Sequence, residues 1–236
     1  VHRWYSPEGI GYGFLLPNGN LLARTEPDPE GQGMGGSSKS IIELDWDGNV
    51  VWEFRGPVLH HDFHRTESGS TIVLTWEKLD QSLADSVGGG FYEDGVDPGM
   101  FGDSVIEVSP SGETMNTWNA WEHLDTAADV ICQLENRKEW THANSISLTP
   151  DGEFLISFRQ TSTIGLVDRA TGEFTWKWGP GITSHQHHPT MLANGNILLF
   201  DNGAHRRGMN FSKVLEVNPK TNEIEWEYQG DPPLSF

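Results

Sequence analysis

The chain has 236 residues and a formal net charge of −19, which argues against non-specific binding to nucleic acid and against docking on anionic lipid. It contains 27 glycines and 13 prolines, and no apolar run approaches the roughly 20 residues that a membrane-spanning helix needs. Its one cysteine, Cys132, cannot form an internal disulfide, so cysteine usage does not define the compartment.

A strand-rich unit occurs four times along the chain. Each copy is predicted to contain two apolar strands around a tight turn, followed by a hairpin that ends on tryptophan. The turn glycines are Gly19, Gly69, Gly152 and Gly195. The closing hairpins are 41–52 (IIELDWDGNVVW), 105–118 (VIEVSPSGETMNTW), 164–176 (IGLVDRATGEFTW) and 214–226 (VLEVNPKTNEIEW).

Repeats of about four short strands each are typical of a β-propeller. We therefore predict an all-β chain with about four blades, each a four-stranded antiparallel sheet. Because a closed array of repeats shares one ring, residues 1–236 are predicted to form a single domain. Both ends look incomplete, since 1–4 (VHRW) resembles the last strand of a preceding blade and 231–236 stop where another blade would begin. The closing tryptophans are predicted to pack between blades.

Three segments interrupt the repeat at 25–38, 79–103 and 119–139. Solvated loops are one interpretation, and a functional lid is the other. The second segment also carries acidic residues that leave calcium binding open, although their spacing matches no established calcium loop. They are Glu93, Asp94, Asp97 and Asp103.

Histidines recur at one position of the repeat, just before the first strand. His60 and His61 occupy it in LHHDF, His142 in WTHANSI, and His187 and His188 in SHQHHP. The first strand of each propeller blade lines the central channel, so these imidazoles are predicted to converge at one mouth of it.

Hairpin geometry adds further groups to this place. Folding the strands about Asp151 and Gly152 brings Arg159 roughly opposite Asn144, at the same end of the blade as His142. Folding about Asn194 and Gly195 brings Asn202 beside His187 by the same argument.

The set His142, Arg159 and His187 suits an oxyanion. Arginine offers a planar fork to sulfate or phosphate oxygens, and histidine acts as nucleophile, acid or base near neutral pH. Zinc is the competing interpretation, because imidazole is a favoured ligand, but a neighbouring Arg159 would repel a cation. Taken singly, each residue also has an ordinary structural role open to it.

The sequence segments that carry these residues resemble the bacterial arylsulfotransferase family, whose members need no nucleotide sulfate. The resemblance covers most of the chain, from about Gly11 to Trp226. It is carried by WTHANSISLTPDGEFLISFRQ, by the Q-H pair of HQHHP with NGNILLFDNG, and by LHHDF. It implies a six-bladed propeller and ping-pong transfer of a sulfuryl group from an aryl sulfate to a phenol through a sulfohistidine.

The resemblance also implies roles for individual residues. His187 matches the histidine that becomes sulfated, with His185 and His188 as rival nucleophiles. His142 and Arg159 match the groups that hold the sulfuryl oxygens and assist departure of the phenolate, and His61 matches the remaining catalytic histidine. The residues expected to contact substrate are His60, His188, Asn144 and Asn202.

The implied partners are a small aryl sulfate and phenols, without nucleic acid, membrane insertion, metal or other cofactor, and with homo-oligomers left open. The usual location of the family's members implies that the protein is periplasmic or secreted. The alternative function is a non-catalytic propeller that binds an anion or a metal as a scaffold.

Overall fold

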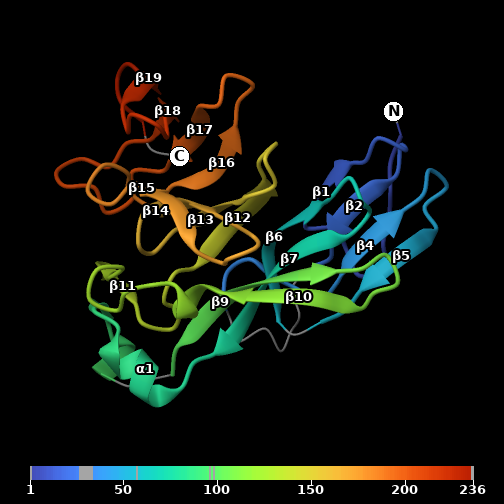
Figure 1. Ribbon diagram of the computed structural model, residues 1–236, viewed down its shortest axis with the longest axis horizontal. Coiled ribbons are helices and arrows are strands. Elements are labelled where there is room, and N and C mark those ends of the chain that lie inside the picture. Colours follow the sequence, from blue (N-terminus) through green and yellow to red (C-terminus); the bar gives the residue numbers. More distant parts are fainter. Residues whose placement is uncertain (1, 27–33, 57, 96, 98, 235–236) are drawn as a thin grey trace. The chain divides into compact units, whose positions relative to one another are not determined.

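The computed structural model describes residues 2–26, 34–56, 58–95, 97 and 99–234 (Figure 1). They form two compact units. The first comprises Val1–Glu77 and Ser104–Thr117, and the second comprises Lys78–Asp103 and Trp118–Phe236. A single domain over 1–236 stays a prediction, as does the comparison of 1–4 and 231–236 with neighbouring blades, because Val1 and 235–236 lie outside the described residues.

Strands dominate the described residues, and the helices are short. The helical segments are α1 (Gln81–Ser86) and the 3₁₀ turns Glu93–Gly95 and Ala120–Glu122. The strands are β1 (Tyr12–Leu15), β2 (Leu21–Arg24), β3 (Ser37–Ser38), β4 (Ile41–Leu44), β5 (Val50–Phe54), β6 (Leu59–Arg65), β7 (Thr71–Lys78), β8 (Gly89–Phe91), β9 (Phe101–Val108), β10 (Thr114–Asn119), β11 (Ile131–Asn136), β12 (Ala143–Leu148), β13 (Phe154–Phe158), β14 (Thr163–Val167), β15 (Phe174–Trp178), β16 (His187–Met191), β17 (Ile197–Asp201), β18 (Lys213–Val217) and β19 (Ile224–Gln229).

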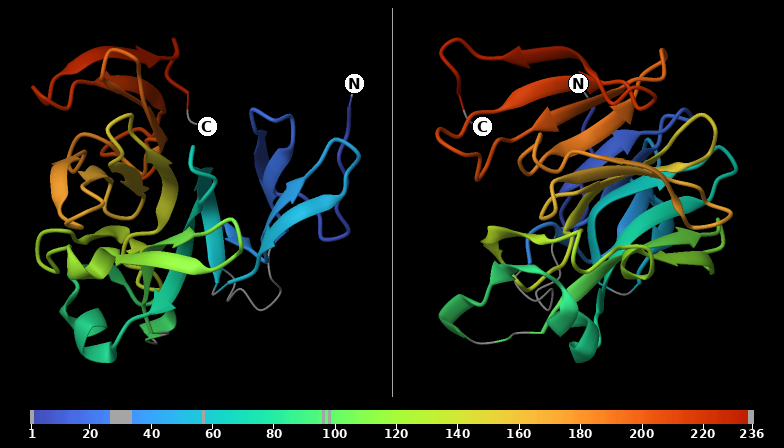
Figure 2. Two further views of the ribbon diagram at one scale, coloured as in Figure 1. Left: turned by 45° about the vertical axis from the view of Figure 1, so that its right-hand side comes forward. Right: turned by 60° about the vertical axis from the view of Figure 1, so that its left-hand side comes forward.

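The strands build four sheets in chain order, which confirms the prediction of an all-β fold with four-stranded blades. Their orders are β1-β2-β4-β5, β10-β9-β7-β6-β3, β12-β13-β14-β15 and β16-β17-β18-β19, so the second sheet gains β3 as a fifth, edge strand. Figure 2 shows the fourth sheet, coloured orange to red, as a twisted meander. β8 and β11 form a separate parallel pair.

The four turn glycines make the first hairpin of each sheet. Gly19, Gly69, Gly152 and Gly195 have φ between 84° and 89°, a left-handed conformation that glycine adopts without a side-chain clash. Each donates its N–H to the carbonyl three residues earlier, as Gly152 does to Thr149 over 2.9 Å. In three of the sheets these turns bring a strand that carries histidines beside the next strand, with a register shift between the turn and the histidines.

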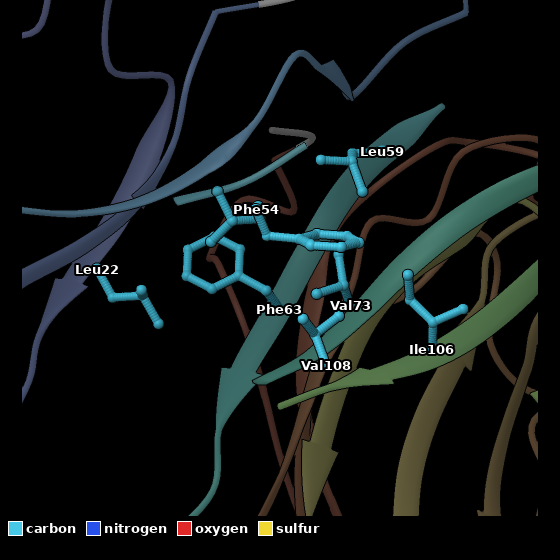
Figure 3. Close-up of a cluster of buried hydrophobic side chains, with 8 residues drawn as sticks. Leu22, Phe54, Leu59, Phe63, Val73, Ile106 and Val108 are labelled. Carbon is cyan, nitrogen blue, oxygen red and sulfur yellow. The ribbon is translucent and has the colours of Figure 1, made fainter. Parts of the chain in front are cut away.

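Each unit has its own apolar core. In the first, Leu22, Phe54, Leu59, Phe63 and Val73 pack with Ile41, Ile106 and Val108 (Figure 3). In the second, the core joins the third and fourth sheets, which lie side by side. Its members are Leu155, Ile164, Leu166, Trp178, Ile197, Leu199, Leu215 and Val217. The inner strands β13 and β14 are buried at every position, which explains their continuous apolar runs.

Three indole N–H groups donate to hairpin turns that are distant in the sequence. Trp4 donates to the Asp45 carbonyl over 2.8 Å, and Trp118 donates to the Gly172 carbonyl over 2.8 Å. Trp176 donates to Oδ1 of Asn222 over 2.7 Å. Within the second unit, closing tryptophans therefore connect one sheet to the next, as the sequence predicted, whereas Trp226 is 49% exposed.

None of the helices among the described residues is long and apolar enough to cross a membrane.

Candidate active site

Four predicted site residues lie at one end of the third and fourth sheets. His142 directly precedes β12 and Arg159 directly follows β13, while His187 begins β16 and Asn202 directly follows β17. In an antiparallel hairpin the start of one strand adjoins the end of the next, so both hairpins present these residues at the same end. β12 and β13 contact β16, which brings the two pairs together in the second unit.

The imidazole of His187 is held through one nitrogen. Its Nδ1 lies 2.6 Å from Oδ1 of Asn202 and 3.1 Å from the carbonyl oxygen of His185. A carbonyl only accepts, so Nδ1 carries the proton in the neutral ring, and Nε2 carries the lone pair. The expected neighbourhood of His187 and Asn202 is present.

Burial lowers the pKa of His187, while its hydrogen bonds to Asn202 and to the His185 carbonyl act in the opposite direction. The positive charges of Arg159 and His142 lower it further. These charges act on His187 only because the groups are close, so the three residues form one electrostatic cluster. The cluster favours a neutral imidazole at neutral pH.

Arg159 and His142 are joined by backbone and carboxylate contacts. The Arg159 N–H donates to the His142 carbonyl over 3.1 Å, whereas the sequence placed Arg159 opposite Asn144. The regular pairing nearer the turn would place Arg159 opposite Ala143, and the register shift between Ala143 and Ser145 moves it one residue further, to His142. The guanidinium donates through Nη1 to Oε1 of Glu135 over 2.8 Å.

His142 makes a close carboxylate contact through its side chain. Its Nδ1 lies 2.9 Å from Oε1 of Glu139, which is 5% exposed. Because a carboxylate accepts, it fixes the Nδ1 proton of His142. The pair has the arrangement of a histidine acid or base oriented by a buried carboxylate.

Gln186 anchors the segment that precedes His187. Its side chain is fully buried, and Nε2 donates to Oγ of Ser157 and to the carbonyls of Phe158 and Thr163 over 3.0 to 3.1 Å. Its Oε1 accepts from Thr183 over 3.0 Å. The glutamine of the Q-H pair therefore fastens the fourth sheet's first strand to the third sheet.

Two buried aspartates hold the loops on either side. Asp103 accepts from Oγ1 of Thr141 and from the Ala143 N–H, which fixes the segment around His142. Asp201 accepts from the Ser184 N–H over 2.8 Å and pairs with Arg206, which fixes the segments before His185 and after β17. Asp103 was predicted as one of four acidic residues open to calcium, and it serves this positioning contact.

The histidine segments use an unusual backbone conformation. His61, His142, His185 and His188 have φ between 45° and 60°, in the left-handed region that non-glycine residues seldom adopt. Such conformations persist where surrounding contacts impose them, and they concentrate at functional sites.

Other predicted residues lie elsewhere or take other roles. Asn144 is buried and donates through Nδ2 to the Gln186 carbonyl over 2.9 Å, so it positions the Q-H segment. His188 is exposed. His60 and His61 belong to the first unit, where their Nδ1 atoms lie 3.0 Å apart and His60 stacks on Trp76. Their part in the site stays a prediction.

Sequence reasoning missed the carboxylates Glu135 and Glu139, and it gave His205 no role. Glu135 and Glu139 come from the segment 119–139, for which a functional loop was the alternative interpretation. No strand alternation or repeat position marks these residues, because their direction depends on how the loops fold.

The second unit also has a cavity of about 460 Å³ between the third and fourth sheets. Turn residues such as Thr149, Asp151 and Gly195 line it, at the opposite ends of the strands from His142 and His187. Its lining contains no histidine.

The sequence profile of the Arylsulfotransferase (ASST) family matches residues 29–183. The chain belongs to the arylsulfotransferase family. The matched region includes His60, His61, His142 and Arg159 and ends before His187. A search of curated proteins finds no match to the chain.

Solved structures share the fold at low sequence identity. A protein of unknown function from Bacteroides caccae is 14% identical with a TM-score of 0.56, and the similarity covers 93% of this chain and 60% of that one. A streptogramin B lyase is 13% identical with a TM-score of 0.53, and the similarity covers 94% of this chain and 55% of that one. The hydrazine synthase of Kuenenia stuttgartiensis is 12% identical with a TM-score of 0.53, and the similarity covers 96% of this chain and 51% of that one. The chain thus spans 60% or less of the length of these relatives.

Proposed function

We propose that this chain carries the centre of an arylsulfotransferase that moves a sulfuryl group from an aryl sulfate to a phenol, with His187 as the covalent nucleophile. Family membership supports the reaction class. The observation that carries the assignment is the pair of oxygen contacts at Nδ1 of His187, which leave the lone pair on Nε2.

In the first half-reaction, Nε2 of His187 attacks the sulfur and forms an N–S bond. The bond between sulfur and the aryl oxygen breaks, and the phenolate leaves with its electron pair. The ring keeps its Nδ1 proton and becomes positively charged. Asn202 Oδ1 and the His185 carbonyl accept from that N–H, so they stabilise the charge that develops during the transfer.

Arg159 and His142 are assigned to the negative charge on the sulfuryl oxygens and on the departing phenolate oxygen. The guanidinium of Arg159 is the group that binds the equatorial sulfuryl oxygens. His142, oriented by Glu139, gives a proton from Nε2 to the departing phenolate oxygen. His188 and Asn202 are proposed to lie near the substrate, and Asn144 is proposed to act by holding the Q-H segment. Roles for His60 and His61 stay predictions.

The second half-reaction returns the enzyme to its starting state. The acceptor phenol gives its proton to Nε2 of His142, and its oxygen attacks the sulfur of the sulfohistidine. The N–S bond breaks and its electron pair returns to Nε2 of His187. Protons and charge therefore balance over the cycle without a further reactant.

The direct test is isolation of the covalent intermediate. The protein is incubated with 4-nitrophenyl sulfate without acceptor, quenched in alkali and digested, and the peptides are weighed by mass spectrometry. We expect one sulfuryl group on the peptide that contains His187, with one equivalent of nitrophenol released in a burst. Addition of a phenol should remove the label and yield the aryl sulfate of that phenol.

A matched pair of variants assigns the label. His187→Gln should abolish both burst and adduct, whereas His123→Gln, a change in the same unit at a histidine paired with Glu173, should retain them. An adduct on His185 or His188 in the unchanged protein would reassign the nucleophile. Tight sulfate binding without nitrophenol release would favour the alternative of a non-catalytic anion-binding scaffold. The substrates, oligomeric state and export to the periplasm or beyond stay predictions.

A further inference from the structure

A thiol and two imidazoles meet beside the proposed active site and have no part in its mechanism. Cys132 lies in β11, His185 in the segment before β16, and His205 in the segment after β17. One ligand atom of each lies within 4.8 Å of the others. Metal-binding groups from three separate parts of the second unit therefore lie close together.

Glu135 adds a carboxylate to the three. Its Oε1 lies 3.5 Å from Nδ1 of His185 and 3.6 Å from Nδ1 of His205, and Sγ of Cys132 lies 3.5 Å from the same His205 nitrogen. Ligand atoms around a tetrahedral zinc ion are about 3.3 to 3.6 Å apart, given its usual bond lengths. Three of the six separations therefore match edges of such a tetrahedron, and the ligand atoms of Cys132, His185 and His205 lie within 4.8 Å of one another.

The buried ring of His185 gives an independent indication. The residue is 2% exposed, and its Nδ1 has no hydrogen-bond partner among the described residues. Buried polar atoms in proteins are nearly always partnered, so an orphaned ring nitrogen indicates an absent ligand.

We propose that Cys132, His185 and His205 bind a zinc ion, with Glu135 as the fourth ligand. Thiolate, imidazole and carboxylate together are a zinc ligand set. This differs from the sequence prediction of no metal and from a site made of His142 and His187.

Charge supports the same assignment. The Cys132 thiolate and the Glu135 carboxylate offset the two charges of the ion. Arg159, which argued against zinc from sequence, lies 2.8 Å from the same Glu135, so its charge remains as one net positive charge on the cluster. A carboxylate bound to a metal through one oxygen still accepts from an outer donor, and such outer contacts are usual at metal sites.

The site would fasten three segments that approach the active site. It would hold β11, the 202–212 segment and the turn two residues before His187, and it would remove His185 from the rival nucleophiles. Binding of zinc alone is independent of sulfuryl transfer, so failure of either proposal leaves the other open to its own test.

The experiment uses the full chain, treated with chelator and then titrated with zinc. We expect one equivalent of zinc by elemental analysis after dialysis, a higher melting temperature, and protection of Cys132 from alkylation. Cobalt(II) in place of zinc should give the thiolate-to-cobalt charge-transfer absorption and the visible bands of tetrahedral cobalt.

Variants at the accessible ligands avoid disturbing the buried ring. Cys132→Ser and His205→Gln should each weaken zinc binding by at least about tenfold, as loss of a ligand-sphere group does. Cys132→Ser should also abolish the charge-transfer band of the cobalt form. His123→Gln should change neither the zinc affinity nor this band. Absence of zinc and cobalt binding, or equal binding by Cys132→Ser, overturns the proposal, and retention of copper with rejection of zinc overturns the choice of ion.

Discussion

The Nδ1 atom of His187 lies 2.6 Å from Oδ1 of Asn202, which directly follows the neighbouring strand β17. The contact sets which ring nitrogen carries the proton. If His187 is the nucleophile, the same contact stabilises the positive ring that forms when Nε2 is sulfated, so Asn202 acts on the rate through His187.

Asn202→Ala should therefore slow the release of nitrophenol in the burst phase. Hydrogen bonds to charged groups contribute about 1.5 to 3 kcal/mol, which corresponds to a loss of about 10- to 150-fold. Single-turnover kinetics give this rate directly. Asn202→Asp keeps an acceptor at Oδ1 and should restore most of the rate. A purely structural role predicts equal losses in both variants and a lower melting temperature.

Acidification should slow formation of the adduct. Burial lowers the pKa of His187 below the ordinary 6.5, so the neutral nucleophile persists to lower pH and the acid limb should lie below 6.5. Arg159 and His142 face His187 and add to the shift, while Asn202 opposes it. The burst rate against pH, measured with chelator in every sample, gives the limb.

The Asn202→Ala variant tests whether this acid limb reports the pKa of His187. Removal of a hydrogen bond that raises the pKa should move the acid limb to still lower pH. A limb above 6.5, or one that moves upward in Asn202→Ala, would assign the titration to another group.

Arg159→Lys should impair transfer although it conserves charge. The lysine ammonium lacks the planar fork that matches two sulfuryl oxygens, and loss of one such donor lowers the rate about 100- to 1,000-fold. Burst rates at saturating donor measure the change. Arg207→Lys, at an exposed position in the same unit, serves as the control. Equal rates in Arg159→Lys and the parent protein would remove Arg159 from the charge-stabilising role.

Gln186→Leu should destabilise the fold of the second unit. The leucine fills a similar volume but leaves the carbonyls of Phe158 and Thr163 without their side-chain donor. Unsatisfied buried groups cost about 1 to 3 kcal/mol, which denaturant titration resolves as a lower midpoint. Gln133→Leu, on the exposed side of β11, should leave the midpoint nearly unchanged.

Trp176→Phe should weaken the connection between the third and fourth sheets. It removes the indole N–H that donates to Asn222, a bond for which we expect about 1 kcal/mol of unfolding free energy. A double-mutant cycle with Asn222→Gly isolates the bond, because glycine keeps the left-handed turn at this position. Additive losses in the cycle would show that the bond does not contribute. Trp226→Phe, at a half-exposed indole, is the matched control.

The repeat made much of the fold predictable. Turn glycines and closing tryptophans recur in each copy, so the four sheets and their hairpins follow from local rules of strand alternation and turn geometry. The approach of Asn202 to His187 was predicted from the same rules, and it is present although the register of that hairpin shifts between His187 and Thr190.

The rest of the candidate site lies beyond such rules. Arg159 lies opposite His142 and not opposite Asn144, and one residue of this difference comes from a bulge, which leaves no periodic signal. In a regular strand, Cys132 and Glu135 would point to opposite faces, but the register of β11 shifts between Ile131 and Asn136. His205 depends on the path of a loop with no repeat counterpart.

The left-handed backbone at His142 and His185 has a practical consequence for mutagenesis. Histidine tolerates the left-handed region better than alanine does, so an alanine scan would mix a change of backbone strain with lost chemistry at these two sites. His187 begins an extended strand, so alanine at this position adds no strain from a left-handed backbone. Asparagine, which tolerates the left-handed region, is the better replacement at His142 and His185, and libraries restricted to asparagine, aspartate and glycine there would retain more folded protein.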